Sequence, residues 1–364
     1  MRRFCILLSG ILCSCVHQVS QSDVINIPVR VEKTDEAFIE AAGEIDAVVI
    51  DESKCLLGSE IGFYPLGSDF LFVDKKNHRI SRFSSNGLFL NEIGHRGNGP
   101  SEYSYILNVQ VHNDTVIVFS LPDKILRYSA EGECIGTKNN MHLGLSSLFD
   151  KDGLMVTYYG YTGADSHRIA AYHEGKECLR CLPLKNKVMS LDLGNDLFYG
   201  YDDAYYLLDS YVPSIYRWRE GALSEYLAFD LGKYAIKDDF FEFKDPFKSA
   251  EYLMSSDYSL IYRYICDSDH QLVQINIHPK EKNSFVLYGL SEDGFWRWFT
   301  LPEGADDPVS GPFRFYKDGC LYCLLGPEHA NAFFTAYASK INHPEILNNI
   351  KNSDAHIVAK IRFN

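Results

Sequence analysis

Apolar and polar residues alternate in short runs that close on a glycine, and this pattern recurs along the chain at a nearly constant spacing. The segment Ile80–Gly87 has the same pattern as Ile125–Gly132, which starts 45 residues later. Two further copies start at Ile169 and Ile215, so the spacing stays between 44 and 46 residues. A period of ~40 to 50 residues with about four strands per unit is typical of β-propeller blades. The pattern therefore predicts an all-β chain built from repeated blades.

The rest of the pattern sets the number of blades. A second apolar run precedes each copy at a matched distance: Leu71–Val73, Val116–Val118, Met155–Thr157 and Tyr206–Leu208. A fifth copy spans Phe285–Gly294, with an outer strand at Phe295–Phe299 and a partner strand at Ser259–Ile265. A sixth unit begins at Phe313–Tyr316 and ends with the strand His356–Phe363. We therefore predict one six-bladed β-propeller, similar to the NHL-repeat type.

The sixth unit lacks an outer strand because the chain stops. A strand from the N-terminal side must close the ring, since an open ring leaves unpaired sheet edges. Ala47–Ile50, just ahead of the first blade, is the natural donor. Before it, Val24–Val31 alternates weakly, and Thr34–Gly43 has the end signals of a short helix. We therefore expect a propeller over residues 46–364 and an N-terminal tether over residues 16–45.

Two insertions interrupt the period, at Leu231–Tyr252 and at Pro327–Asp354. The second has helical spacing of its apolar residues, so short helical insertions are expected there. Long loops in a propeller either shape a binding face or cover it. Both interpretations remain open for each insertion.

Composition and charge exclude some functions. The 24 Tyr and 23 Phe residues favour strands, because aromatic rings suit a pleated, half-buried surface. The chain has 35 basic and 49 acidic residues, a net charge of −14, and no cluster of Lys and Arg. Binding to nucleic acid, or to an anionic membrane surface through a polybasic patch, is therefore not expected.

Residues 1–15 have the features of an export signal. Basic residues at Arg2 and Arg3 precede a short apolar run, Phe4–Leu12, which is too short to span a bilayer. The sequence Leu-Cys-Ser-Cys that follows resembles a bacterial lipobox and predicts lipidation of Cys15. We therefore expect an exported protein that is lipid-anchored in the cell envelope, on the periplasmic or outer-membrane face. The alternative is ordinary signal cleavage that leaves a secreted protein.

The cysteines argue against a disulfide framework and against a metal site. Seven of the 10 lie beyond Cys15, and an odd number cannot be fully paired. The pairs Cys178/Cys181 and Cys320/Cys323 have the Cys-x-x-Cys spacing, but residues three apart on a strand point to opposite faces. We interpret both pairs as core cysteines.

One dense motif follows the first repeat: Gly97, Gly99, Pro100, Glu102 and Tyr103. This Gly-x-Gly-Pro-x-Glu-Tyr segment resembles the six-bladed β-propeller lipoproteins of Gram-negative gut-type anaerobes, which are mostly of unassigned function. The resemblance covers nearly the whole mature chain and implies a propeller anchored in the envelope. Ser101 departs from the family, which commonly has a second glycine there. The resemblance supplies no catalytic residues.

Propeller geometry places the 94–104 loop on the same face as the loops that join the second and third strands of the blades. Polar side chains on that face form a candidate ligand-binding rim: His78, Arg79, His95, Arg96 and Asp209. A structural interpretation competes for the motif itself. The glycines and Pro100 would shape a tight turn, Glu102 would accept backbone N–H groups, and Tyr103 would pack between blades.

These observations predict a non-catalytic binding module that recognises a glycan, a peptide or a partner protein of the envelope at the loop face. The alternative is a metal-dependent hydrolase or lactonase with its site in the central channel. Carboxamide and carboxylate candidates for such a metal exist, at Asp74, Asn77, Asn108 and Asp209. No spacing brings them to one point, so we assign no catalytic residue, no metal site and no cofactor.

Overall fold

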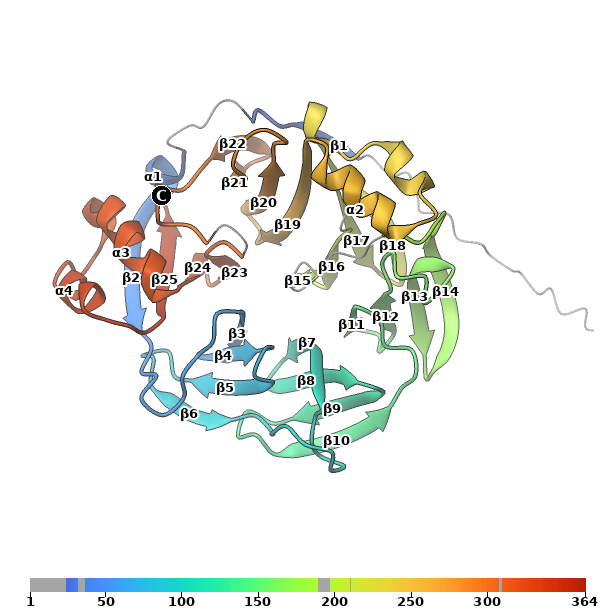
Figure 1. The fold of residues 1–364 in the computed structure, drawn as a ribbon. Coiled ribbons are helices and arrows are strands. Elements are labelled where there is room, and N and C mark those ends of the chain that lie inside the picture. Colours follow the sequence, from blue (N-terminus) through green and yellow to red (C-terminus); the bar gives the residue numbers. More distant parts are fainter. Residues whose placement is uncertain (1–23, 32–36, 189–196, 210, 308–309) are drawn as a thin grey trace, which may run out of the picture.

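Six antiparallel sheets are arranged in a ring around a central axis in the computed structural model (Figure 1). The structure describes residues 24–31, 37–188, 197–209, 211–307 and 310–364. Each sheet is one blade, with its first strand facing the axis and its last strand at the outside of the ring. The predicted six-bladed β-propeller is therefore confirmed.

The first three blades follow chain order from the inner to the outer strand. Blade one consists of β3 (Ile61–Leu66), β4 (Asp69–Asp74), β5 (Arg79–Phe83) and β6 (Phe89–Glu92). Blade two consists of β7 (Tyr105–His112), β8 (Thr115–Leu121), β9 (Lys124–Tyr128) and β10 (Cys134–Asn139). Blade three consists of β11 (Ser146–Phe149), β12 (Met155–Tyr158), β13 (His167–His173) and β14 (Lys176–Pro183).

The last three blades contain the irregular features. Blade four consists of β15 (Phe198–Tyr201), β16 (Ala204–Leu208), β17 (Ser214–Arg219) and β18 (Ala222–Asp230). Blade five consists of β19 (Tyr258–Cys266), β20 (His270–His278), β21 (Phe285–Glu292) and β22 (Phe295–Phe299). Blade six consists of β23 (Phe313–Lys317), β24 (Cys320–Leu325), β25 (Ile357–Phe363) and the N-terminal strand β2 (Ala42–Val49).

Strand β2 closes the ring as predicted. It pairs antiparallel with β25, with Val48 opposite Val358, so the last strand of the chain has no open edge. The strand is longer than Ala47–Ile50, because it already begins at Ala42. Helix α1 (Ala37–Ala41) leads directly into it and buries Phe38.

The segment expected as a tether contributes a strand to the propeller. Strand β1 (Ile25–Pro28) pairs in parallel with β18 and adds a fifth strand to the outside of blade four. Ile27 is its one buried side chain and packs into the core that blade four shares with its neighbours. The expected helix start at Thr34 and Asp35 lies outside the described residues.

Both insertions pack against blades. The first consists of two 3-10 turns, η1 (Gly232–Tyr234) and η2 (Asp238–Glu242), and of helix α2 (Pro246–Met254). Phe240 of η2 is buried against Tyr211 beside blade four. The second consists of α3 (Pro327–Ala336), the 3-10 turn η3 (Ala338–Lys340) and α4 (Ile346–Lys351), at the outer side of blade six (Figure 1). The buried side chains Phe333 and Phe334 join this insertion to the core of blade six.

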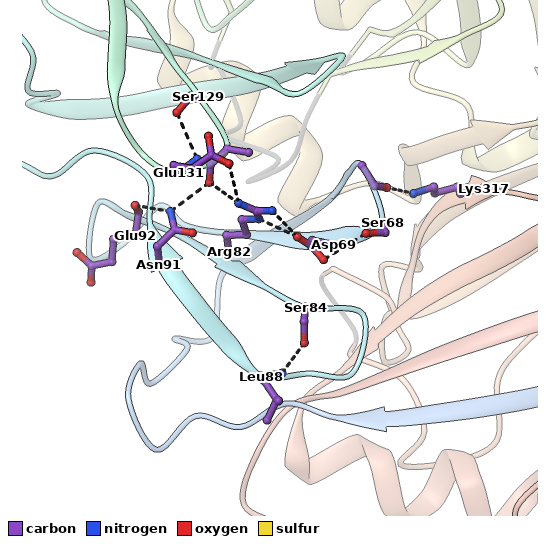
Figure 2. Close-up of polar contacts among 12 residues, drawn as sticks. Ser68, Asp69, Arg82, Ser84, Leu88, Asn91, Glu92, Ser129, Glu131 and Lys317 are labelled. Carbon is purple, nitrogen blue, oxygen red and sulfur yellow. Dashed lines mark hydrogen bonds and ion pairs between the residues drawn. The ribbon is translucent and has the colours of Figure 1, made fainter.

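The contacts between blades explain why the repeat keeps its glycine. In the seam between blades one and two, Arg82 donates to Asp69 and to the backbone oxygen of Ala130 in the next blade (Figure 2). The β9–β10 turn is thereby held close to β6. Gly132 in this turn has a φ of +89°, and a Cβ there would lie 2.3 Å from the backbone oxygen of Glu92. Only glycine tolerates both the positive φ and the close approach.

The cysteine pairs lie on opposite strand faces, as the spacing predicted. Cys320 packs in the cluster between blades six and one, whereas Cys323 packs in the cluster between blades five and six. Cys181 is buried, as expected of a core cysteine. Cys178 is exposed, so its interpretation as a core cysteine is wrong. The outermost strand β14 has one face against solvent, which explains the difference. All seven cysteines within the described residues are free thiols.

Candidate ligand-binding site

The central channel contains a cavity of about 390 Å³, which is open to solvent. The six inner strands all contribute to its wall: β3, β7, β11, β15, β19 and β23. This volume lies in the range of small-molecule sites, which are concave and combine aromatic surface with a few polar groups. The cavity is therefore the first place to look for a ligand.

Tyrosines dominate the wall of the channel cavity. Six of them come from four blades: Tyr64, Tyr199, Tyr201, Tyr205, Tyr264 and Tyr316. A tyrosine ring offers an apolar face and a polar hydroxyl, so such a wall suits a ligand with both kinds of surface.

Two amides in the wall have a structural task. Asn108 donates to the backbone oxygen of Ser147 at 2.7 Å and accepts from its N–H at 3.0 Å. Gln110 makes the same two bonds to Phe149, at 2.7 and 2.8 Å. The side chains of β7 thus act as a backbone edge for β11 and join the inner strands of blades two and three. They hold the shape of the wall and have few hydrogen bonds left for a ligand.

The charges on the wall differ in sign from those of the whole chain. Four cationic side chains line the cavity: Lys75, Lys151, Arg263 and Arg314. Among the described residues, two carboxylates line it, Asp202 and Asp203, and Asp203 is paired with Lys151 at 3.3 Å. A protein of net charge −14 therefore has a channel with an excess of positive charge. A low-dielectric channel strengthens the field of such charges.

Arg263 and Arg314 are the least satisfied of these cations. Arg314 is 8% exposed, and its Nη1 donates to the backbone oxygens of Gly311, Ser310 and Phe313. Arg263 reaches the same Ser310 oxygen at 3.5 Å. Burial, followed by the charge of Arg263, lowers the pKa of Arg314 from 12.5 to about 9. Among the described residues, no carboxylate forms an ion pair with either guanidinium.

The glycine-rich loop is held together by its own groups. Glu102 accepts from the Gly99 N–H at 2.7 Å and contacts His95 Nε2 at 2.9 Å. The Gly99 hydrogen bond, followed by His95, lowers the pKa of Glu102. Tyr103 is buried between blades one and two, where its ring packs edge-on against Tyr128. His95 and Arg96 are exposed on this loop, and His95 is held by Glu102.

The other rim candidates lie deeper. His78 is 8% exposed and packs on Tyr105, and burial, followed by Arg96, lowers its pKa. Arg79 donates to the Leu56 backbone oxygen. Asp209 has a fully buried side chain that accepts from Arg168 in blade three. None of the five rim candidates lines the channel cavity. Arg96 lies close enough to His78 to affect its charge, whereas Asp209 lies in blade four and is paired with Arg168.

The four candidates for a channel metal each have other partners. Asp74 caps the turn that follows it by accepting from the Asn77 side chain at 2.7 Å. Asn108 is bonded to Ser147, and Asp209 is bonded to Arg168. These residues lie in blades one, two and four and do not form one ligand set. In the parts of the chain that the structure describes, no group of three or more His, Cys, Asp or Glu residues has the geometry of a metal site.

Sequence reasoning missed Arg263 and Arg314. A signal existed, because each arginine stands between two aromatic residues in an apolar strand, as Tyr262-Arg263-Tyr264 and Phe313-Arg314-Phe315. The same pattern also occurs at Tyr216-Arg217-Trp218. Arg217 lies on the third strand of its blade, away from the channel, and stacks on Tyr226. The pattern alone therefore does not identify the channel.

The fold and the channel cavity define the protein as a six-bladed β-propeller with a central polar and aromatic pocket. The family model described as "Domain of unknown function (DUF4934)" matches residues 25–362. The chain therefore belongs to this family. No curated protein matches the sequence significantly.

Solved structures resemble the fold at low sequence identity. One of them is a protein from Bacteroides fragilis that is described as expected to be exported. It is 15% identical to this chain with a TM-score of 0.74, and the match covers 94% of this chain and 100% of that chain. A member of the DUF4221 family from Bacteroides vulgatus is 11% identical with a TM-score of 0.50, over 89% of this chain and 97% of that chain. At these identities the likeness concerns the fold alone.

The helices give no sign of a membrane span. Within the described residues, none of them is long and apolar enough to cross a bilayer. The predicted lipidation site, Cys15, lies outside the described residues.

Proposed function

We propose that this protein is a non-catalytic binding module of the cell envelope that takes a polar ligand, the end of a glycan or a short peptide, into its central channel. The observation that carries the proposal is the cavity of about 390 Å³ with its tyrosine-rich wall. The sequence alone favoured a binding site on the loop face of the propeller. The cavity favours a binding site in the channel instead, and none of the rim candidates lines this cavity.

Several features of the channel support binding without chemistry. Asn108 and Gln110, which an enzyme could use to hold a substrate, are bonded to the backbone of β11. The tyrosine rings can stack on the apolar faces of sugars or of peptide side chains. Their hydroxyls can reach hydroxyl or amide groups of the same ligand. Such a wall can orient a ligand through stacking and hydrogen bonds.

A substitution that fills the cavity tests the proposal. Gly200 lies on the inner strand β15 and lines the cavity, and a Cβ there would meet only the ring of Tyr205, at 3.1 Å. We expect Gly200→Trp to fill much of the channel and to lower the affinity for any channel ligand by about tenfold or more. Binding is measured by calorimetry with oligosaccharides and short peptides that raise the melting temperature of the unsubstituted protein.

Gly136 provides a matched control. It lies on the outer strand β10, has an ordinary φ, and has no atom within 4 Å of the Cβ position. Gly136→Trp adds the same side chain outside the channel and should leave affinity unchanged. Equal affinities for all three proteins would refute a channel site.

We further propose that Cys15 anchors the protein to the envelope through a lipid. One support is the sequence Leu-Cys-Ser-Cys, which resembles a lipobox. The other is the fold, which is similar to that of the Bacteroides fragilis protein expected to be exported. In cells of a related bacterium, Cys15→Ala should move the protein from the membrane fraction to the soluble fraction and abolish incorporation of labelled fatty acid. Unchanged fractionation of the variant would contradict lipidation at this position.

A further inference from the structure

We propose that Arg263 and Arg314 form an oxyanion subsite in the channel, so that the ligand carries a carboxylate or a phosphate. This inference rests on the proposed function and names the ligand class that the channel selects. It depends on two guanidiniums that meet at one backbone oxygen in the channel wall, each with a buried N–H that has no partner within the described residues.

The two arginines converge from neighbouring blades. Arg263 lies on β19, the inner strand of blade five, and Arg314 lies on β23, the inner strand of blade six. Arg263 Nη2 lies 3.5 Å and Arg314 Nη1 lies 3.4 Å from the same backbone oxygen, that of Ser310. Both side chains also line the channel cavity. A single anion in this part of the channel could therefore contact both guanidiniums.

The hydrogen-bonding capacity of these groups is not used up within the chain. In the described part of the structure, Nε of Arg263 and Nε of Arg314 are both buried without a partner. Each guanidinium has five N–H donors in a planar fork that matches the oxygens of a carboxylate or phosphate. A buried donor without an acceptor destabilises the folded state, so an oxyanion that accepts these bonds would be bound firmly.

The electrostatics of the pair point in the same direction. Arg314 is more than nine-tenths buried and faces a second cation, Arg263, and both disfavour its charge more strongly than the carboxylate of Asp307 favours it. A bound anion would relieve the repulsion between the two cations and replace the solvent that Arg314 has lost. A neutral ligand would do neither. The excess of cations along the rest of the wall would draw the same anions into the channel.

The pair borders two cavities of different size. Besides the channel cavity, Arg314 lines a small cavity of about 40 Å³. Both arginines line the channel cavity, which at about 390 Å³ is the larger of the two. We therefore expect the ligand to reach the pair from the channel.

Calorimetric titration of the purified protein at low, constant ionic strength tests the subsite. The probes are glucuronate, with a carboxylate, and glucose 6-phosphate, with a phosphate, each compared with neutral glucose. We expect at least one anionic probe to bind saturably and more tightly than glucose. Arg263→Gln should weaken that binding by about tenfold or more, because it removes hydrogen bonds between charged groups. The probe that binds more tightly identifies the anion.

Arg217→Gln is the matched control, because Arg217 also stands between two aromatic residues but lies on the third strand of its blade, away from the channel, where it stacks on Tyr226. This variant should change the affinity by no more than about twofold, whereas a general field effect would weaken binding equally in both variants and would overturn the subsite. Arg314→Met provides a second test, with circular dichroism as the check of folding. Retained anion binding in Arg263→Gln and Arg314→Met would also overturn it.

The outcomes separate the subsite from the proposed function. If neutral sugars or peptides bind and Gly200→Trp prevents this, while both anionic probes fail to bind, the channel site stands and the oxyanion subsite is wrong. If the anionic probes bind and both arginine variants lose them, the subsite stands. If neither anionic nor neutral probes bind in the channel, both proposals are wrong.

Discussion

Two largely buried arginines in different blades of the ring show how the same side chain can serve two purposes. Arg168, on β13 of blade three, donates to the carboxylate of Asp209 and to the hydroxyl of Tyr161. Tyr158 and Tyr161 also donate to Asp209, at 3.0 and 3.3 Å. Although burial disfavours the charged guanidinium, Asp209 raises the pKa of Arg168 above its usual range.

Arg314 has no such partners. Its hydrogen bonds go to backbone oxygens, and burial together with the charge of Arg263 lowers its pKa to about 9, although Asp307 acts in the opposite direction. In blade three, the chain itself supplies a carboxylate counter-charge for Arg168. In blades five and six, Arg263 and Arg314 form no ion pair with a carboxylate among the described residues. We interpret the first arrangement as structural and the second as part of a binding site.

The first prediction breaks the satisfied pair and has the largest expected effect. Asp209→Ala leaves Arg168 buried without a counter-charge and removes the acceptor of two tyrosine hydroxyls. We expect the free energy of unfolding to fall by about 3 to 5 kcal/mol, as measured by urea denaturation. The double variant Arg168→Met, Asp209→Ala should recover part of this loss, because no unpaired charge remains. A loss below about 1 kcal/mol in the single variant would show that the pair does not hold blades three and four together.

The blades could be predicted from sequence because the turn glycine of the repeat meets the same steric constraint in successive blades. Gly87 and Gly132 both have a positive φ and both have a backbone oxygen of the preceding outer strand within 2.4 Å of the Cβ position. The closing role of β2 could be predicted as well, since the sixth blade has too few strands of its own. Strand β1 could not, because its parallel pairing with β18 depends on the path that the chain takes around the ring.

The candidate site was harder to predict, because burial of a polar residue depends on partners far away in sequence. Asp209 follows an apolar run and resembles an exposed loop residue, yet its partner Arg168 stands 41 residues earlier. Arg263 and Arg217 each stand between two aromatic residues in sequence. Only the position of the strand in its blade, innermost or third, places Arg263 in the channel and Arg217 outside it.

The second prediction concerns a carboxylate that has a tyrosine partner but no arginine. Asp306 accepts from Tyr288 at 2.7 Å, as Asp209 does from its tyrosines, but no cation forms an ion pair with it among the described residues. Burial raises the pKa of Asp306 from 3.8 to about 7. The folded protein therefore binds a proton that the unfolded chain has released, and stability from this group is lost as the pH rises from about 4 to about 7.

We expect the free energy of unfolding to be about 1 to 2 kcal/mol lower at pH 8 than at pH 5 because of Asp306. Asp306→Asn should remove this part of the pH dependence, since the amide has no charge to desolvate. Urea denaturation at a series of pH values measures both proteins. An unchanged slope in the variant would mean that Asp306 ionises as freely in the folded protein as in the unfolded chain.

The last prediction is a small change in the free energy of unfolding, opposite in sign to the change expected for Asp209→Ala. Arg314→Met replaces a desolvated, repelled cation with an apolar side chain of similar length, and it also removes hydrogen bonds to Gly311 and Ser310. The relief of the charge should slightly exceed the lost bonds, so in anion-free buffer the free energy of unfolding should stay equal or rise by about 1 kcal/mol. If the oxyanion subsite is real, the order reverses when a binding anion is added, because only the parent protein gains stability from it. If the free energy of unfolding fell by more than about 2 kcal/mol in anion-free buffer, Arg314 would be a structural arginine like Arg168, stabilised by contacts within the chain.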